Sequence, residues 1–238
     1  MIQVQVLPFG VLKDRLGASP STVELPEGAT VASLLDHLNA TNAHSLQGIA
    51  VSVNAEYASA SHTLHEGDEV GLLPPVSGGT NDSASGSVKL THDLIDSASI
   101  VAAAKHAEDG AIVVFDGIVR NHSRNRQTLH LDYEAYEEMA LNQMRTLAAQ
   151  AREKYGVRHV TMIHRLGRLN IGETSVLIVV ASAHRAQAYE ASRWLIDTLK
   201  KTVPIWKRET FVDGSVWAAG EPFPDNLAIA PAEAAHDA

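Results

Sequence analysis

The sequence predicts an α+β protein of two domains, and three observations lead to this fold class. The chain has 238 residues, more than one small domain needs and enough for two. Segments in which apolar and polar residues alternate, as in strands, are interspersed with segments of helical periodicity. Residues 80–87 hold only Thr, Asn, Asp, Ser, Ala and Gly, the composition of a flexible linker. We therefore expect domains at 1–79 and 88–217, joined by this linker and followed by a disordered tail at 218–238.

The first domain is expected to be a small mixed sheet packed on one helix. Alternating or apolar segments bounded by Pro and Gly predict strands at 2–6, 21–28, 49–57 and 64–76. Thr30 is a suitable N-cap for a helix at 30–40. The apolar residues that recur on one face of this helix are Val31, Leu34, Leu35 and Leu38.

The second domain interleaves strands and helices. Strands are predicted at 110–121, 128–136, 157–167, 174–182 and, as a final pair, 203–217. Helical periodicity predicts helices at 99–109, 137–155 and 186–201. The last of these helices is expected to end before Pro204. The polar, basic segment 123–127 is expected to be a loop.

The composition excludes several classes of protein. Hydrophobic residues make up 45% and charged residues 20%, a mixture typical of globular proteins and not of disordered ones. No apolar run approaches the roughly 18 residues that span a bilayer, and the first residues, MIQVQVLPFG, lack the features of a secretory signal. We therefore expect a cytoplasmic protein with no membrane partner. Because the chain has no cysteine, disulfides and thiolate chemistry are excluded.

Most of the net charge of −9 lies in the first domain. Residues 1–80 carry two basic and eight acidic residues, a net charge of −6. Such an acidic domain is not expected to bind nucleic acid. It suits docking onto a basic surface, although acidity that serves only solubility explains the charge equally well.

Basic residues at the ends of predicted elements indicate a pocket for a small anionic molecule. An apolar strand at 176–181 leads to His184 and Arg185, where the next helix begins and its backbone N–H groups attract anions. Arg120 ends another apolar strand. A purely local role, in which His184 caps the helix or hydrogen-bonds nearby, is the alternative.

Lys207 is the strongest candidate for a reacting group. In an extended strand its side chain shares a face with Val203 and Ile205, so the pleat directs the ammonium toward an apolar side. A lysine held in this way can act as a nucleophile, acid or base. Trp206 makes the opposite face apolar too, which weakens this argument. Lys200 lies seven positions earlier, in the last turn of a predicted helix, where the helix dipole alone favours cations.

Motifs of other catalytic classes are missing from the sequence. There is no G-x-G-x-x-G, no G-x-x-x-x-G-K-[ST], no H-E-x-x-H and no G-x-S-x-G. The chain has twelve histidines, and His62 and His65 lie close together, but no cysteine or obvious further ligand accompanies them. We therefore expect no metal site.

Several motifs resemble molybdopterin synthase. The segment LHEGDEVGLLPPVSGG, residues 64–79, resembles the C-terminal end of the small sulfur-carrier subunit of that enzyme. Four segments resemble its large catalytic subunit: FDGIVRNHS, VTMIHRLGRL, VVASAHRAQAYEA and LKKTVPIWKRE. The two resemblances cover about 1–79 and 88–217, so the chain resembles both subunits fused in one polypeptide. They imply a ubiquitin-like β-grasp domain followed by an α/β hammerhead-type catalytic domain.

The resemblance also implies a reaction, a sulfurtransferase step of molybdenum cofactor biosynthesis. In this family cyclic pyranopterin monophosphate receives two sulfur atoms and becomes molybdopterin, with no bound cofactor. Sulfur arrives as a thiocarboxylate on the carrier's terminal glycine, which matches Gly79 and follows Gly78, after an adenylating enzyme activates the carboxylate. Because glycine lacks Cβ, this tail can enter a narrow channel. Family members pair their large subunits, so we expect a homodimer through the C-terminal domain.

Carried over position by position, the resemblance assigns roles to single residues. Lys207 takes the central catalytic role, and Lys200 assists it. Arg120, His184 and Arg185 match the pocket that binds phosphate and pterin. The residues that flank this pocket are Ile118, Val119, Arg208 and Glu209.

The chain departs from the family at the sulfur-carrying glycine. In the separate carrier the second glycine ends the chain, whereas Gly79 is joined to Thr80 by a peptide bond. A thiocarboxylate therefore cannot form on the intact chain, and we predict that a protease cleaves after Gly79. Two alternatives stay open. The first domain is a sulfur carrier or ubiquitin-like modifier for another pathway, tethered to a pterin-binding domain, or the chain is a scaffold that binds pterin without turnover.

Overall fold

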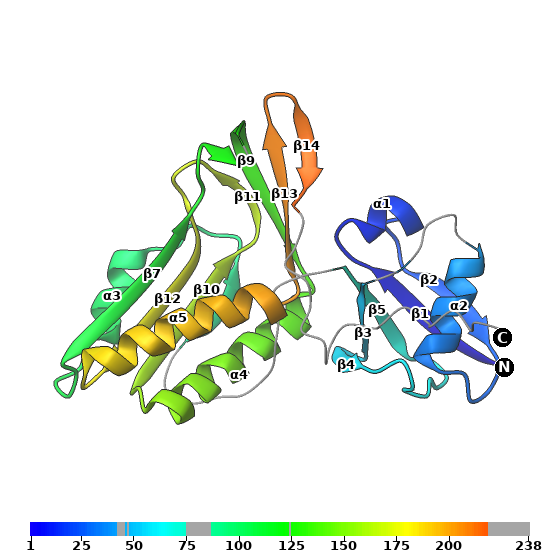
Figure 1. The fold of residues 1–238 in the computed structure, drawn as a ribbon, viewed down its shortest axis with the longest axis horizontal. Coiled ribbons are helices and arrows are strands. Elements are labelled where there is room, and N and C mark those ends of the chain that lie inside the picture. Colours follow the sequence, from blue (N-terminus) through cyan, green and yellow to red (C-terminus); the bar gives the residue numbers. More distant parts are fainter. Residues whose placement is uncertain (42–45, 47, 75–86, 124, 219–238) are drawn as a thin grey trace, which may run out of the picture. The chain divides into compact units, whose positions relative to one another are not determined.

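The computed structural model describes residues 1–238 with the exception of 42–45, 47, 75–86, 124 and 219–238 (Figure 1). The chain forms two compact units, and the residues described in them lie on either side of the gap at 75–86. The predicted linker at 80–87 and the predicted tail at 218–238 fall almost wholly outside the described residues. Their bounds stay predictions.

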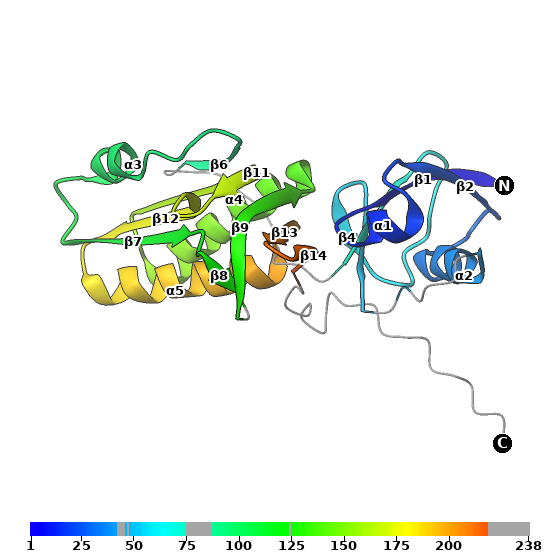
Figure 2. The ribbon, with the colours of Figure 1, turned by 90° about the horizontal axis from the view of Figure 1, so that it is seen from above.

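The first unit is a mixed sheet with one main helix. Its elements are β1 (Ile2–Pro8), α1 (Leu12–Leu16), β2 (Ser21–Leu25), α2 (Val31–Thr41), β3 (Ala50–Val53), β4 (Glu56–Ala58) and β5 (Glu69–Leu73). The strands lie in the order β2-β1-β5-β3-β4, with β1 parallel to β5 and antiparallel to β2. Helix α2 covers one face of the sheet (Figure 2). This arrangement confirms the predicted β-grasp domain, to which the structure adds the short helix α1.

Helix α2 begins and packs as the sequence predicts. The Ser33 N–H donates to Thr30 Oγ1 at 3.3 Å, and the Thr30 N–H donates to Ser33 Oγ at 3.2 Å. This reciprocal pair satisfies two backbone N–H groups at the helix start. The apolar face of α2 is buried, and its Leu34 lies in one core with Val4 and Val6 of β1.

The second unit contains two sheets and three helices in the described part of the chain. Its elements are β6 (Val88–Thr91), α3 (Ser97–Ala104), β7 (Ala111–Ile118), β8 (His122–Ser123), β9 (Arg126–Ala135), α4 (Glu137–Tyr155), β10 (His159–Arg165), β11 (Gly167–Asn170), β12 (Thr174–Ser182), α5 (Arg185–Thr202), β13 (Ile205–Phe211) and β14 (Gly214–Trp217). One sheet has the order β6-β10-β12-β7. The other has the order β11-β9-β13-β14, and β8 pairs with β9.

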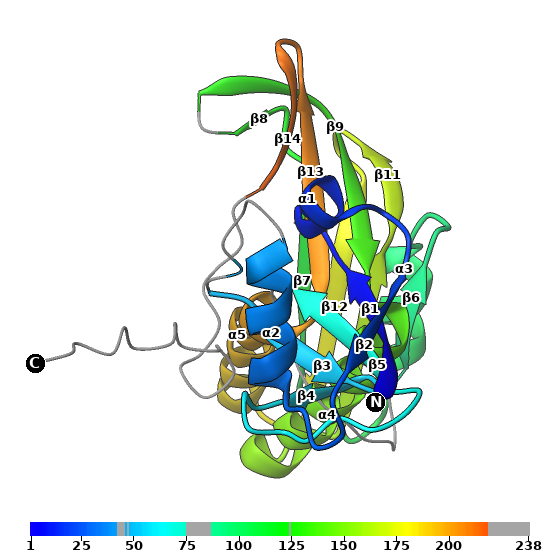
Figure 3. The ribbon, with the colours of Figure 1, turned by 90° about the vertical axis from the view of Figure 1, so that its right-hand side faces the viewer.

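The first of these sheets is buried on both faces. Ile178 and Val180 of β12 pack with α4 and α5, whereas Leu177 and Val179 pack with Ala104 of α3. Figure 2 shows α5 and α3 on opposite sides of β12 and β7. The second sheet is formed by long β9 and the β13–β14 hairpin, which extend beyond the other strands of the unit (Figure 3). This sheet carries the lysine of the predicted site.

Several predicted bounds are wrong. The strand predicted at 49–57 is two strands, β3 and β4, which pair with each other. The helix predicted at 99–109 is α3, which ends at Ala104 because the segment after it turns to place Asp109 against Arg158. The strand predicted at 157–167 is followed by a separate strand, β11, which pairs with β9. The loop predicted at 123–127 contains the end of β8 and the start of β9, which pair antiparallel. In each case a long-range contact or a strand pairing decides the local structure.

Candidate functional site

Lys207 lies in the middle of β13 and is held by a buried carboxylate. Its Nζ lies 2.9 Å from Glu209 Oε1. The Lys207 side chain is 39% exposed and that of Glu209 is 6% exposed. Because side chains two positions apart in a strand share a face, Ile205, Lys207 and Glu209 point the same way. Ile205 on this face is buried, but Trp206 on the opposite face is buried too, so burial does not distinguish the two faces. The structure adds the countercharge of Glu209.

The residues opposite Lys207 form an apolar floor. In the β13–β9 register Lys207 pairs with Tyr133 and Glu209 pairs with Leu131. Leu131 packs with Val119 and Leu169, and Tyr133 packs against the same cluster. We call Lys207, Glu209, Tyr133, Leu131 and Val119 the Lys207 cluster. Packed side chains therefore connect Val119 to the strand pair that carries Lys207. This is compatible with the prediction that Val119 flanks the pocket.

A buried histidine lies behind this floor. The ring of His164 in β10 meets the ring of Tyr133 edge-on, with centroids 4.9 Å apart. His164 Nδ1 donates to the carbonyl oxygen of Arg165 at 2.9 Å. Burial lowers the pKa of His164 to about 4, so the ring is uncharged near neutral pH. His164 therefore supports Tyr133 as a neutral side chain and carries no charge into the site.

Arg120 follows β7, and the backbone before it is fixed by two hydrogen bonds. The Val119 N–H donates to the Glu173 carbonyl at 3.0 Å, and the Gly172 N–H donates to the Val119 carbonyl at 2.8 Å. Glu173 is in turn held by Arg165 Nη1 at 2.7 Å. Ile118 and Arg120 are exposed on either side of buried Val119. Among the residues that the structure describes, the Arg120 guanidinium has no ion-pair partner, so it is available to an anion.

Lys200 and Arg208 are close to Lys207 in the sequence, and both side chains are exposed. Lys200 is exposed in the last turn of α5, and the buried residues Val203 and Pro204 connect this turn to β13. Arg208 is exposed over the ring of Trp217, with its guanidinium carbon 5.8 Å from the ring centroid. Because Arg208 is adjacent to Lys207 in the strand, the two side chains point to opposite faces. The structure therefore does not bring Arg208 onto the lysine's face.

His184 and Arg185 form a separate corner at the start of α5, which we call the histidine corner. His184 is the N-cap residue with extended backbone, and no side chain caps the helix there. Both side chains are exposed. In the β12–β7 register Ser182 pairs with Ala111, whereas Thr174 pairs with Ile118. The histidine corner and Arg120 thus lie at opposite ends of the same strand pair.

The sequence predicts one pocket, but in a single chain the residues predicted to form it lie in two separate places. The Lys207 cluster, Arg120 and the end of α5 lie at one end of the second unit, and the histidine corner lies at the other. Gly78 and Gly79 fall outside the described residues. Tyr133 and His164 were missed, although alternation places Tyr133 on the same face of β9 as Leu131 and would have indicated it once the β9–β13 pairing was known.

No helix in the described part of the chain is both long and apolar enough to cross a membrane. Within the same residues, no group of three or more His, Cys, Asp or Glu side chains is placed to hold a metal ion.

Two family models match the chain, one for each unit. The ThiS family matches residues 6–79 and the MoaE protein family matches residues 90–202. The first match ends at Gly79, the second glycine of the predicted sulfur-carrying tail. The second match contains Arg120, His184 and Lys200 but ends before Lys207.

Relatives and solved structures agree with the second match. A molybdopterin synthase catalytic subunit from Pyrococcus abyssi is 38% identical over 121 residues, which are 51% of this chain and 82% of that protein. One from Bacillus subtilis is 40% identical over 129 residues, 54% of this chain and 82% of that protein.

A crystal structure of molybdopterin synthase from Staphylococcus aureus is 36% identical, with a TM-score of 0.53, and covers 55% of this chain and 96% of its own. The MoaE protein from Burkholderia ambifaria is 28% identical, with a TM-score of 0.50, and covers 60% of this chain and 95% of its own. The chain therefore belongs to the family of molybdopterin synthase catalytic subunits, carries a ThiS-family sulfur-carrier domain before the catalytic domain, and functions as a molybdopterin synthase in molybdenum cofactor biosynthesis.

Proposed function

We propose that the chain converts cyclic pyranopterin monophosphate to molybdopterin in the cytoplasm, with sulfur from a thiocarboxylate on Gly79 and with no bound cofactor. The observation that carries this proposal is the Lys207–Glu209 pair. The carboxylate 2.9 Å away holds the ammonium in one direction while leaving it partly exposed to a ligand. Such a group can donate a proton to a leaving oxygen or stabilise negative charge as a carbon–sulfur bond forms. Lys200 assists it, and Arg120 binds phosphate.

Substitution of single lysines tests this assignment. Lys207→Ala should lower the rate of molybdopterin formation by about a hundredfold or more, the range typical of a lost general acid or base. Lys201→Ala removes an exposed lysine from the same helix turn as Lys200 and serves as the matched control, with a rate close to that of the unaltered protein. Substrate binding, measured by calorimetry, should change little in Lys207→Ala. A Lys207→Ala protein that keeps its rate would overturn the assignment.

The carrier half of the proposal requires a free carboxylate at Gly79. A protease that cuts between Gly79 and Thr80 would release it, and an adenylating enzyme would then load sulfur on it. The end of the ThiS-family match at residue 79 supports this cleavage site. Intact-mass measurement of protein from its native host should find a fragment ending at Gly79, partly with one oxygen replaced by sulfur. Active protein that stays full-length throughout would contradict cleavage.

The separation of the predicted pocket supports a homodimer in which two copies complete each site. The histidine corner of one copy would face the Lys207 cluster of the other. Strand β7 lies at the edge of its sheet, and its exposed Val114 and Ile118 are apolar side chains that a second copy could cover. In this arrangement the second unit forms the dimer, and His184 and Arg185 bind the anionic part of a substrate held mainly by the partner.

A further inference from the structure

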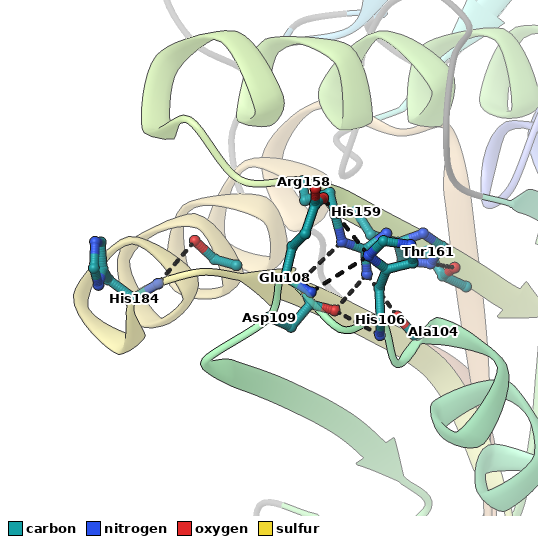
Figure 4. A network of polar contacts seen from close by, with 9 residues as sticks. Ala104, His106, Glu108, Asp109, Arg158, His159, Thr161 and His184 are labelled. Atoms are coloured by element: carbon teal, nitrogen blue, oxygen red, sulfur yellow. Dashed lines mark hydrogen bonds and ion pairs between the residues drawn. The ribbon is translucent and has the colours of Figure 1, made fainter.

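A partly buried ion pair lies next to the histidine corner and takes no part in the proposed chemistry. Arg158, just before β10, donates from Nε to Asp109 Oδ1 at 2.8 Å and from Nη2 to Asp109 Oδ2 (Figure 4). The Asp109 side chain is 4% exposed. These hydrogen bonds from Arg158 hold the pKa of the Asp109 carboxyl below its usual range, so it is ionised near neutral pH. The pair is thus a charged link between residues 49 positions apart in the sequence.

The ion pair fixes the loop that follows α3. Arg158 Nη2 also donates to the Ala104 carbonyl at 2.8 Å, at the end of that helix. The Asp109 carboxylate accepts from the His106 N–H at 3.0 Å, and the Asp109 N–H donates to the His106 carbonyl at 3.1 Å. One side chain therefore holds both ends of the turn at 104–109. Figure 4 shows this network beside the start of α5, where His184 lies.

The fixed loop in turn holds the backbone immediately before His184. The Gly110 N–H donates to the Ser182 carbonyl at 3.0 Å, and the Arg158 N–H donates to the Ala181 carbonyl at 3.0 Å. Ser182 Oγ then accepts from the His184 N–H at 3.5 Å. Hydrogen bonds thus continue from the ion pair to the first residue of the histidine corner.

Gly110 allows this close approach because it has no side chain. A Cβ at this position would lie 2.2 Å from the Ala183 carbonyl oxygen, a distance that real Cβ atoms do not show. The loop and the strand end could then no longer touch without moving Ala183, the residue that precedes His184. We call Asp109, Gly110 and Arg158 the Arg158 clamp.

A contribution to the free energy of unfolding does not by itself explain why the chain has this ion pair. Removing the Asp109 carboxylate from water costs free energy that its attraction to the partly exposed Arg158 offsets only in part or just balances. An ion pair with two parallel hydrogen bonds also fixes the direction of its two side chains. The direction matters here because His184 has no side-chain cap of its own and its ring is exposed.

We propose that the Arg158 clamp positions the histidine corner, and so sets how tightly its His184 and Arg185 bind the anionic part of the substrate. This inference rests on the proposed function, in which those two side chains bind cyclic pyranopterin monophosphate. Asp109, Gly110 and Arg158 are positioning residues: they act through the backbone of residues 181–184 and do not touch the substrate. Their loss should weaken binding and leave the chemical step at Lys207 unchanged.

Hydrogen exchange of the full chain tests the structural half directly. Asp109→Asn keeps the shape of the side chain and removes its charge. The amides of Gly110 and His184 should then exchange about tenfold faster, because the local structure opens more often. Asp197→Asn is the matched control, since it breaks an exposed ion pair with Arg193 farther along α5. Unchanged exchange at residues 110 and 184 in Asp109→Asn would overturn the proposal.

A double-variant cycle tests the coupling to the ligand. Calorimetry with cyclic pyranopterin monophosphate should show binding about fivefold weaker in Asp109→Asn. When Asp109→Asn is added to His184→Ala the further loss should be clearly smaller, because only Arg185 is then left for the clamp to position and contacting groups in one network are not independent. In turnover, KM should rise while kcat stays constant. Gly110→Ala perturbs the same contact without altering charge and should reproduce these effects if Asp109→Asn folds poorly.

Pterin binding by these variants distinguishes a failure of the proposed function from a failure of the clamp proposal. If His184→Ala itself leaves pterin binding unchanged, the assignment of the histidine corner in the proposed function is wrong. If His184→Ala weakens binding but Asp109→Asn and Gly110→Ala do not, the function stands and the clamp proposal is overturned. Full additivity of Asp109→Asn and His184→Ala would also overturn it, since Asp109 would then act independently of His184.

Discussion

Two variants that are each impaired when the substrate concentration is well below KM should restore activity when their chains are mixed, if each site is completed by two copies. One variant carries Lys207→Ala and lacks the reacting group, and the other carries His184→Ala and lacks part of the histidine corner. Each forms homodimers in which every site has one defect. In a mixed dimer, one site collects both defects and the other collects none.

The structure gives the separation that makes this test decisive. Ala111 and Ile118 lie seven positions apart in β7, which is about 23 Å at roughly 3.3 Å per residue. Arg185 and Lys200 lie fifteen positions apart in α5, about 22 Å at roughly 1.5 Å per residue. Both lengths are several times the reach of an arginine side chain. One chain therefore cannot close its own histidine corner on its own Lys207.

Random pairing fixes the size of the recovery. Half of the dimers in an equal mixture are mixed, and each has one intact site, so about one quarter of the unaltered activity should return. The assay is conversion of cyclic pyranopterin monophosphate with thiocarboxylated carrier in excess, after the two variants have been unfolded and refolded together. Refolding each variant alone is the control. Activity no higher than the average of the two separately refolded variants would show that the site lies within one chain and would refute the reasoning.

Three further results are expected. Glu209→Gln should lower the rate of sulfur transfer about tenfold or more with little change in KM, because Lys207 loses the carboxylate that orients it. An unchanged rate would show that Glu209 has no role in the site. The free energy of unfolding should fall by about 2 kcal/mol between pH 7 and pH 5 through His164, since its pKa of about 4 in the folded state lies below the ordinary 6.5, so only the unfolded state gains a proton there. In urea titrations His164→Phe should lose this part of the pH dependence, and a fall of equal size in that variant would contradict the account. Thr30→Ala should destabilise the first unit by about 1 kcal/mol through loss of the cap on α2, and an unaltered urea midpoint would show that the cap contributes nothing.

Elements whose signal lies within one segment could be predicted well. Strand β12 was predicted at its observed bounds because it is buried on both faces and therefore reads as one apolar run. Helix α4 was predicted at its observed bounds because its apolar residues keep helical spacing until Gly156, which adopts the left-handed conformation that ends the helix. The end of helix α3 was predicted five residues too late, since it depends on Arg158, far along the chain.

In the candidate site, too, the features set within one segment could be predicted, and those set by the pairing of strands could not. The direction of Lys207 followed from the two-residue period of a strand, and the proximity of Glu209 follows from the same period. The separation of Arg120 from His184 did not follow from the sequence, because both come directly after apolar strands and nothing local distinguishes parallel from antiparallel neighbours. In parallel neighbours the two strand ends would lie at one edge of the sheet. The antiparallel pairing of β7 and β12 places them at opposite edges.

This antiparallel pairing changes how the basic residues of the second unit should be interpreted. Cations at two opposite ends of one sheet do not repel one another strongly, because at such a separation salt screens exposed charges almost completely. A chain can therefore carry both halves of an anion site without the cost of assembling the positive charge before a ligand arrives. In the proposed homodimer the charges would converge only where two copies meet. An anionic substrate that neutralises them would then strengthen the contact between copies, so binding of the pterin and dimer formation should favour each other.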